Sequence, residues 1–60
     1  MTLTIQTEDF GQYDTTRREV HSLEEAKQVI RVALGFSGFQ FAEVVKDGEV
    51  VHYVERSGLK

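Results

Sequence analysis

The sequence contains neither cysteine nor proline. Without cysteine, the chain can form neither a disulfide framework nor a thiolate zinc site, the supplements on which many small domains depend. A chain of 60 residues buries only about 60% of the surface that its unfolded form exposes, so its core is small. The supplement that remains is self-association, and we therefore expect a homodimer.

Positive charge is also scarce. Seven Lys and Arg residues stand against ten Asp and Glu residues, which gives a formal net charge of -3 at pH 7. This balance does not attract nucleic-acid phosphates or an anionic membrane surface. No apolar run approaches the length of a membrane span, and residues 1–9 lack the pattern of a secretory signal. We therefore expect a cytoplasmic protein without membrane contact.

Composition favours a folded chain. With 40% hydrophobic residues and no low-complexity tract, residues 1–60 are typical of one folded domain. The last four residues, 57–60, are expected to form a frayed tail.

The first third of the chain favours two strands joined by a turn. Residues 2–7 alternate between apolar and polar side chains, as in a half-buried strand. A charged pair and Gly11 then break the pattern and predict a turn. Residues 13–20 favour a strand by composition. Three charged side chains interrupt any apolar face of this second strand: Arg17, Arg18 and Glu19. We interpret it as an exposed edge strand that its charges protect from pairing.

The middle of the chain predicts one helix over residues 23–34. Ser22 and Glu25 form a capping box at its start, in which the Ser22 hydroxyl accepts from the Glu25 amide. Six apolar residues share one stripe along the helix: Leu23, Ala26, Val29, Ile30, Ala33 and Leu34. Val32 projects from the opposite side. Gly35 suits the left-handed residue that ends many helices.

Residues 39–56 predict a second hairpin. Two β-branched and aromatic runs, 39–46 and 49–56, flank the dipeptide Asp47-Gly48. This dipeptide tolerates the positive φ angles of a two-residue type I′ turn. A regular ladder from that turn pairs Lys46 with Glu49, Val45 with Val50, Val44 with Val51, Glu43 with His52, Ala42 with Tyr53 and Phe41 with Val54.

This ladder gives the hairpin two apolar faces. One carries Phe39, Phe41, Val45, Val50 and Val54 around the Glu43/His52 pair. The other carries Ala42, Val44, Val51 and Tyr53. The Glu43/His52 pair favours placing the first face outside, whereas its larger apolar area favours placing it inside, so both assignments stay open.

The predicted fold is a single α+β domain of ββαββ order, a four-stranded antiparallel sheet with one helix packed on one face. One helix covers one sheet face and leaves the second open. A contiguous apolar surface on a small protein usually marks an interface.

Residue clusters with catalytic or metal-binding chemistry are not apparent. Glu43 and His52 could orient a general base, but no nucleophile accompanies them. His21 and His52 lack the spacing of metal ligands, and the acidic residues around Gly11 lack the spacing of a calcium loop. We therefore expect no enzymatic activity, no cofactor and no metal.

The sequence instead favours a protein–protein interaction module that is homodimeric through its apolar sheet face together with the edge strand. Tyr53 is the expected anchor, because an aromatic side chain can bury its ring and keep a polar tip in water. Phe39 and Phe41 take that role if the helix covers the other face. The candidate partner-binding residues are Tyr53, Val44, Val51, Ala42, Phe39, Phe41, Arg17 and Arg18.

Two further interpretations concern the kind of partner. By analogy alone, small acidic proteins without catalytic residues are often phage or mobile-element inhibitors of host machinery, such as anti-CRISPR proteins. The alternative is a nucleic-acid-binding accessory protein that contacts phosphates through Arg17, Arg18, Lys27 and Arg31, although the net charge opposes it.

Overall fold

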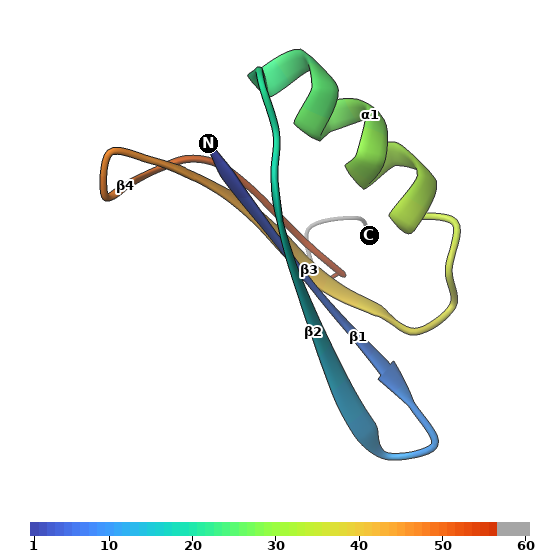
Figure 1. Ribbon diagram of the computed structural model, residues 1–60. Coiled ribbons are helices and arrows are strands. Elements are labelled where there is room, and N and C mark those ends of the chain that lie inside the picture. The colour runs from blue at the N-terminus through green and yellow to red at the C-terminus, as the bar shows by residue number, and fades with distance from the viewer. Residues whose placement is uncertain (57–60) are drawn as a thin grey trace.

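The computed structural model describes residues 1–56 and confirms the ββαββ order (Figure 1). Its elements are β1 (Thr2–Asp9), β2 (Gln12–Glu19), α1 (Leu23–Ala33), β3 (Phe39–Lys46) and β4 (Glu49–Glu55). The four strands form one antiparallel sheet in the order β2-β1-β3-β4, and α1 lies across one face of it. The fold is therefore the predicted α+β architecture. The predicted tail, 57–60, lies outside the described residues.

The two hairpins are joined side by side through their first strands. β1 pairs with β2 on one side and with β3 on the other, so β2 and β4 form the two edges of the sheet. The chain leaves the edge strand β2, crosses the sheet as α1 and returns as β3. The interpretation of residues 13–20 as an edge strand is thus confirmed.

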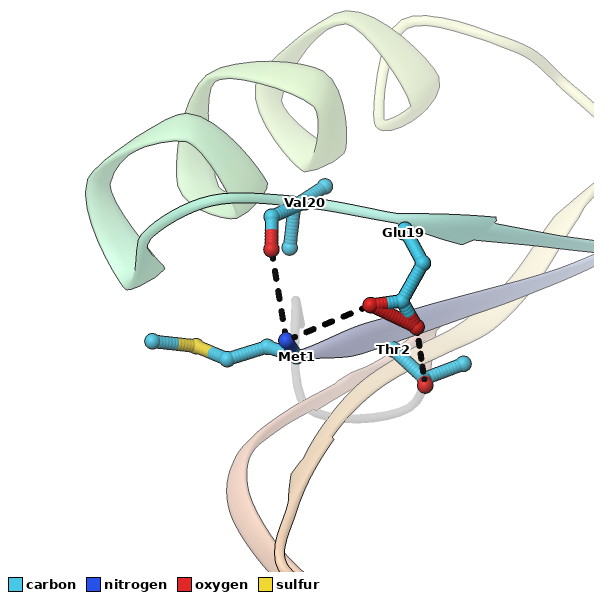
Figure 2. A network of polar contacts seen from close by, with 4 residues as sticks. All are labelled: Met1, Thr2, Glu19 and Val20. Atoms are coloured by element: carbon cyan, nitrogen blue, oxygen red, sulfur yellow. Dashed lines mark hydrogen bonds and ion pairs between the residues drawn. The ribbon is translucent and has the colours of Figure 1, made fainter.

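A small polar network holds the junction where β2 leads into α1 (Figure 2). The amino group of Met1 donates to the carbonyl oxygen of Val20 at 3.3 Å and lies 3.5 Å from a carboxylate oxygen of Glu19. The Val20 amide donates back to the Met1 carbonyl at 2.9 Å. The Thr2 hydroxyl donates to Glu19 at 2.9 Å, and this hydrogen bond is the main reason why the pKa of Glu19 is lowered.

The helix begins as predicted and ends differently. The Ser22 hydroxyl accepts a hydrogen bond from the Glu25 amide at 3.2 Å, which satisfies a donor of the first turn. The last helical residue is one earlier than predicted, with Leu34 as the cap. The prediction that Gly35 ends the helix in the left-handed conformation is wrong, because the φ angle of Gly35 is not positive. Its amide instead donates to the carbonyl of Val32 at 3.1 Å, which tightens the final turn.

The core lies between α1 and the sheet. Its buried members come from both layers and from the β2–α1 connection: Leu3, Val20, Ala26, Ile30, Ala33, Phe39, Ala42 and Val44. Phe39, Leu3 and Val44 are the largest side chains that are fully buried. The helix packs against β1 and β3, the two central strands.

Two register shifts decide which side chains reach this core. The first lies between β1 and β3, where Phe39 pairs with Thr7 but Phe41 pairs with Gln6, so Gln40 is an extra residue. Such a bulge reverses the alternation of sides along the strand. Phe39 therefore faces the helix, whereas Phe41 faces away from it. Their predicted placement on one face is wrong.

The second shift lies within the β3–β4 hairpin. Val45 pairs with Val50 as predicted, but Val44 pairs with His52, which makes Val51 the extra residue. The pairs Val44/Val51, Glu43/His52, Ala42/Tyr53 and Phe41/Val54 are consequently wrong. The observed pairs are Val44/His52, Glu43/Tyr53, Ala42/Val54 and Phe41/Glu55. Glu43 and His52 now lie on opposite faces of the sheet, so the pair considered for general-base chemistry does not exist.

Candidate functional site

The sheet face opposite α1 is the candidate site. Among residues 1–56, no element packs over it (Figure 1). We call it the open face. Its β3 and β4 residues form an apolar cluster around one carboxylate, which we call the aromatic patch: Phe41, Glu43, Val45, Val50 and Tyr53. Its β1 and β2 residues are mostly polar, and they include Thr4, Gln6, Thr15 and Arg17.

Two aromatic rings form the centre of the patch. Phe41 and Tyr53 stack with their centroids 6.1 Å apart and their planes inclined by 22°. They are diagonal neighbours, because the direct partner of Tyr53 is Glu43. Phe41 is half-buried and Tyr53 is 50% exposed. The two rings therefore form a preformed apolar surface, in which the Tyr53 ring is the more exposed to solvent.

The hydroxyl of Tyr53 is held by a neighbour. It donates to a carboxylate oxygen of Glu55 at 3.0 Å. This hydrogen bond raises the pKa of Tyr53 above its ordinary value, because removing the proton would place two negative charges side by side. The ring is thereby fixed at both ends, by stacking on Phe41 and by the bond to Glu55.

The bulge at Val51 decides which β4 residues reach the patch. Val50 pairs with Val45 and Tyr53 pairs with Glu43, so both lie on the open face, and both are exposed. Val51 is the extra residue between them and is also exposed. Val45 and Val50 belong to the patch, but the regular ladder assigned them to the face opposite Tyr53. No local sequence signal marks this bulge.

The predicted partner-binding residues divide between four places. Phe41 and Tyr53 stack in the aromatic patch, and Val51 is exposed at the bulge of β4. Phe39, Ala42 and Val44 are core residues, and the structure corrects their assignment to a partner surface, because α1 covers them. Arg17 and Arg18 are exposed on β2.

Arg17 and Arg18 do not act on one surface. Neighbouring residues of a strand point to opposite faces. Arg17 pairs with Thr4 on the open face, whereas Arg18 pairs with the core residue Leu3 on the helix side. The structure therefore does not bring the two arginines into a common phosphate-binding patch. The other basic residues of that interpretation, Lys27 and Arg31, are exposed on α1.

A second surface is a groove between α1 and β2. It has a volume of about 860 Å³ and exists because the helix packs on β1 and β3 and leaves the helix side of β2 uncovered. Its walls combine apolar and charged side chains, among them Ile5, Val29, Val32, Phe36, Asp14 and Arg18.

Residues 1–56 contain neither a cluster of metal ligands nor a membrane-spanning helix. No group of three or more His, Cys, Asp or Glu side chains in this part of the chain could hold a metal ion. None of its helices has the length and apolar character needed to cross a bilayer.

Comparison with family models, with curated proteins and with solved structures found no match for this chain.

Proposed function

We propose that this chain is a small, non-enzymatic protein-binding module that acts as a homodimer and holds a protein partner on its open face. The observation that carries the proposal is the stacked Phe41–Tyr53 pair on a sheet face that no described element covers. Binding energy in interfaces concentrates in aromatic side chains that bury a ring and keep a polar tip satisfied. Tyr53 has this form, since Glu55 already accepts a hydrogen bond from its hydroxyl group.

The charge within the patch indicates the chemistry of the partner. Glu43 is half-buried beside the aromatic pair and is the direct cross-strand partner of Tyr53. A symmetric packing of two such patches would bring two Glu43 carboxylates together, which costs free energy. A different protein fits the patch better than a second copy does. It would pack an apolar side chain on the Phe41–Tyr53 pair and place a cationic group beside Glu43. We therefore assign the patch to a second protein and the homodimer to another surface.

Affinity capture from a lysate of the source organism tests the proposal. The wild-type chain is compared with Tyr53→Ala and with the control Val32→Ala, which removes an exposed apolar side chain of α1. We expect a protein that the wild type and the control retain and that Tyr53→Ala releases. Thermal unfolding of the three proteins checks that Tyr53→Ala remains folded. Retention of the same proteins by all three would count against the open face as the binding surface.

A further inference from the structure

β2 is a regular strand edge that no other described element covers. All eight of its residues are exposed, and its ladder with β1 runs through eight pairs without a register shift. The other edge strand, β4, is interrupted by the bulge at Val51. Bulges of that kind protect an edge from pairing, whereas a regular edge can accept another strand.

The register with β1 shows which backbone groups of β2 point outward. Val20 and Met1 exchange both backbone hydrogen bonds, at 2.9 and 3.3 Å. Hydrogen-bonded and non-hydrogen-bonded pairs alternate along an antiparallel ladder. The even-numbered residues of β2 therefore bond to β1. The residues that direct their N–H and C=O groups to the solvent edge are Tyr13, Thr15, Arg17 and Glu19.

We propose that two copies of the chain join through β2 in an antiparallel, two-fold pairing centred on Thr16. The inference depends on the proposed function only in expecting a dimer, and it uses a different surface from the open face. In this register Arg18 of each copy lies opposite Asp14 of the other, and Glu19 lies opposite Tyr13. The outward-pointing Thr15 and Arg17 are then hydrogen-bonding partners across the two-fold axis.

Charge selects this register among its neighbours. A two-fold pairing centred on Asp14 would oppose two Asp14 carboxylates, and one centred on Arg17 would oppose two Arg17 guanidinium groups. A pairing centred on Thr15 opposes Arg18 to Gln12 and forms no ion pair. Only the pairing centred on Thr16 gives two Arg18–Asp14 ion pairs without like charges directly opposed. From the sequence alone, the charges of β2 are interpreted as protection of the edge from pairing. In this register they instead complement the charges of a second copy.

The position of α1 leaves room for the second copy. The two-fold axis is perpendicular to the sheet, so both helices lie on the same side of an eight-stranded sheet. Because α1 packs on β1 and β3, the two helix axes would be about 19 Å apart at a strand spacing of about 4.8 Å. Packed helices approach to about 8–10 Å, so the helices do not collide. The Arg18–Asp14 pairs would lie in the grooves beside β2, partly sheltered from water.

Sedimentation equilibrium over a range of concentrations, with charge reversals, tests the pairing. Arg18→Asp and Asp14→Arg each oppose like charges, and we expect each to raise the dimer Kd by about tenfold or more. The double variant restores opposite charges and should return to within about threefold of the wild type. Arg17→Asp is the matched control, because it makes the same charge change on the same strand but faces Thr15.

Amide hydrogen exchange gives a second readout. The amides of Thr15 and Arg17 point to the edge, so their exchange should slow as the protein concentration rises. In the variant Arg18→Asp this concentration dependence should weaken. Thermal unfolding at low concentration checks that the charge variants fold as monomers.

The outcomes separate this inference from the proposed function. A dimer that Tyr53→Ala abolishes and that the charge reversals leave intact overturns the strand pairing, and it places the dimer on the open face instead of a second protein. Loss of dimer in both single variants without rescue in the double variant also overturns the register. A monomer at every concentration overturns the strand pairing, while the capture experiment still tests the open face separately.

Discussion

Phe10 and Asp47 occupy the same position in two turns of the same kind. Their φ angles are 52° and 54°, and each precedes a glycine, Gly11 and Gly48, with φ of 81° and 79°. Both hairpins therefore close with two-residue turns of type I′. Aspartate is favoured at this left-handed position, whereas a bulky aromatic residue is strained there. Phe10 is also 98% exposed, so no packing compensates for the strain.

We predict that Phe10→Asn stabilises the protein by about 1 kcal/mol, because asparagine adopts the left-handed conformation at lower cost and no buried contact is lost. Urea unfolding measures the change as a higher transition midpoint with an unchanged slope. The reciprocal variant Asp47→Phe should lower the midpoint by a similar amount. A lower midpoint for Phe10→Asn would mean that Phe10 makes a stabilising contact in solution.

Local chemistry made most of the fold predictable. The N-cap at Ser22 satisfies a backbone amide of the first helical turn, and the Asp47-Gly48 dipeptide suits the positive φ angles of its turn. Both signals act within a few residues, so the sequence alone reveals them. The helix and four strands followed from periodicity and from these signals, with ends one or two residues off. The predicted left-handed conformation of Gly35 at the helix end was wrong. The last carbonyl groups of the helix instead accept hydrogen bonds in a tightened final turn.

The candidate site was harder to predict, because two bulges decide it. A shift of one residue moves every following side chain to the other sheet face. Gln40 is an extra residue only relative to β1, and Val51 only relative to β3, so local composition does not mark either of them. The regular ladder therefore separated Phe41 from Tyr53, although the two rings stack. It also placed Phe39 beside Phe41, although Phe39 is core.

The contrast between Phe39 and Phe41 is open to measurement. Phe39→Ala removes a ring that is 2% exposed and should cost about 3–5 kcal/mol, which approaches the whole stability of a domain of this size. Phe41→Ala removes a half-buried ring from the open face and should cost about 1 kcal/mol. Circular dichroism during thermal unfolding compares the two variants. Equal losses would contradict the bulge at Gln40.

The linker between α1 and β3 contains a glycine that no other residue can replace without movement. A Cβ atom at Gly38 would overlap the carbonyl oxygen of Glu8, which is backbone and cannot turn away. The same residues are joined by the hydrogen bond from the Glu8 amide to the Gly38 carbonyl, at 2.7 Å. We predict that Gly38→Ala destabilises the protein by about 2 kcal/mol or more, because it separates the β1–β2 hairpin from the linker.

Gly35→Ala is the matched control for that prediction, because its Cβ would lie 3.4 Å from the Val32 carbonyl oxygen, an ordinary contact, at a φ that alanine can adopt. Its unfolding midpoint in urea should stay close to that of the wild type or rise slightly. Similar losses in the two variants would show that the close approach of Gly38 to Glu8 does not exist in solution.

The last prediction concerns pH and Glu19. The hydrogen bond from the Thr2 hydroxyl, and then the charge of the amino terminus, lower the pKa of Glu19 below its ordinary value of 4.5. The folded state thus binds this proton less tightly than the unfolded state. The stabilising contribution of Glu19 is present above pH 4.5 and is lost as the pH falls through the lowered pKa of the folded state.

Glu19→Gln keeps the size of the side chain and removes its ionisation. We expect the wild type to exceed this variant in free energy of unfolding by a constant amount above pH 4.5. That excess should shrink as the pH falls further, which urea unfolding across the acid range measures. Thr2→Val removes the largest cause of the pKa shift and should reduce the pH-dependent part of the excess. An excess that grows toward acid pH would have the wrong sign for a lowered carboxyl pKa, and would place the stabilising form of Glu19 in its protonated state.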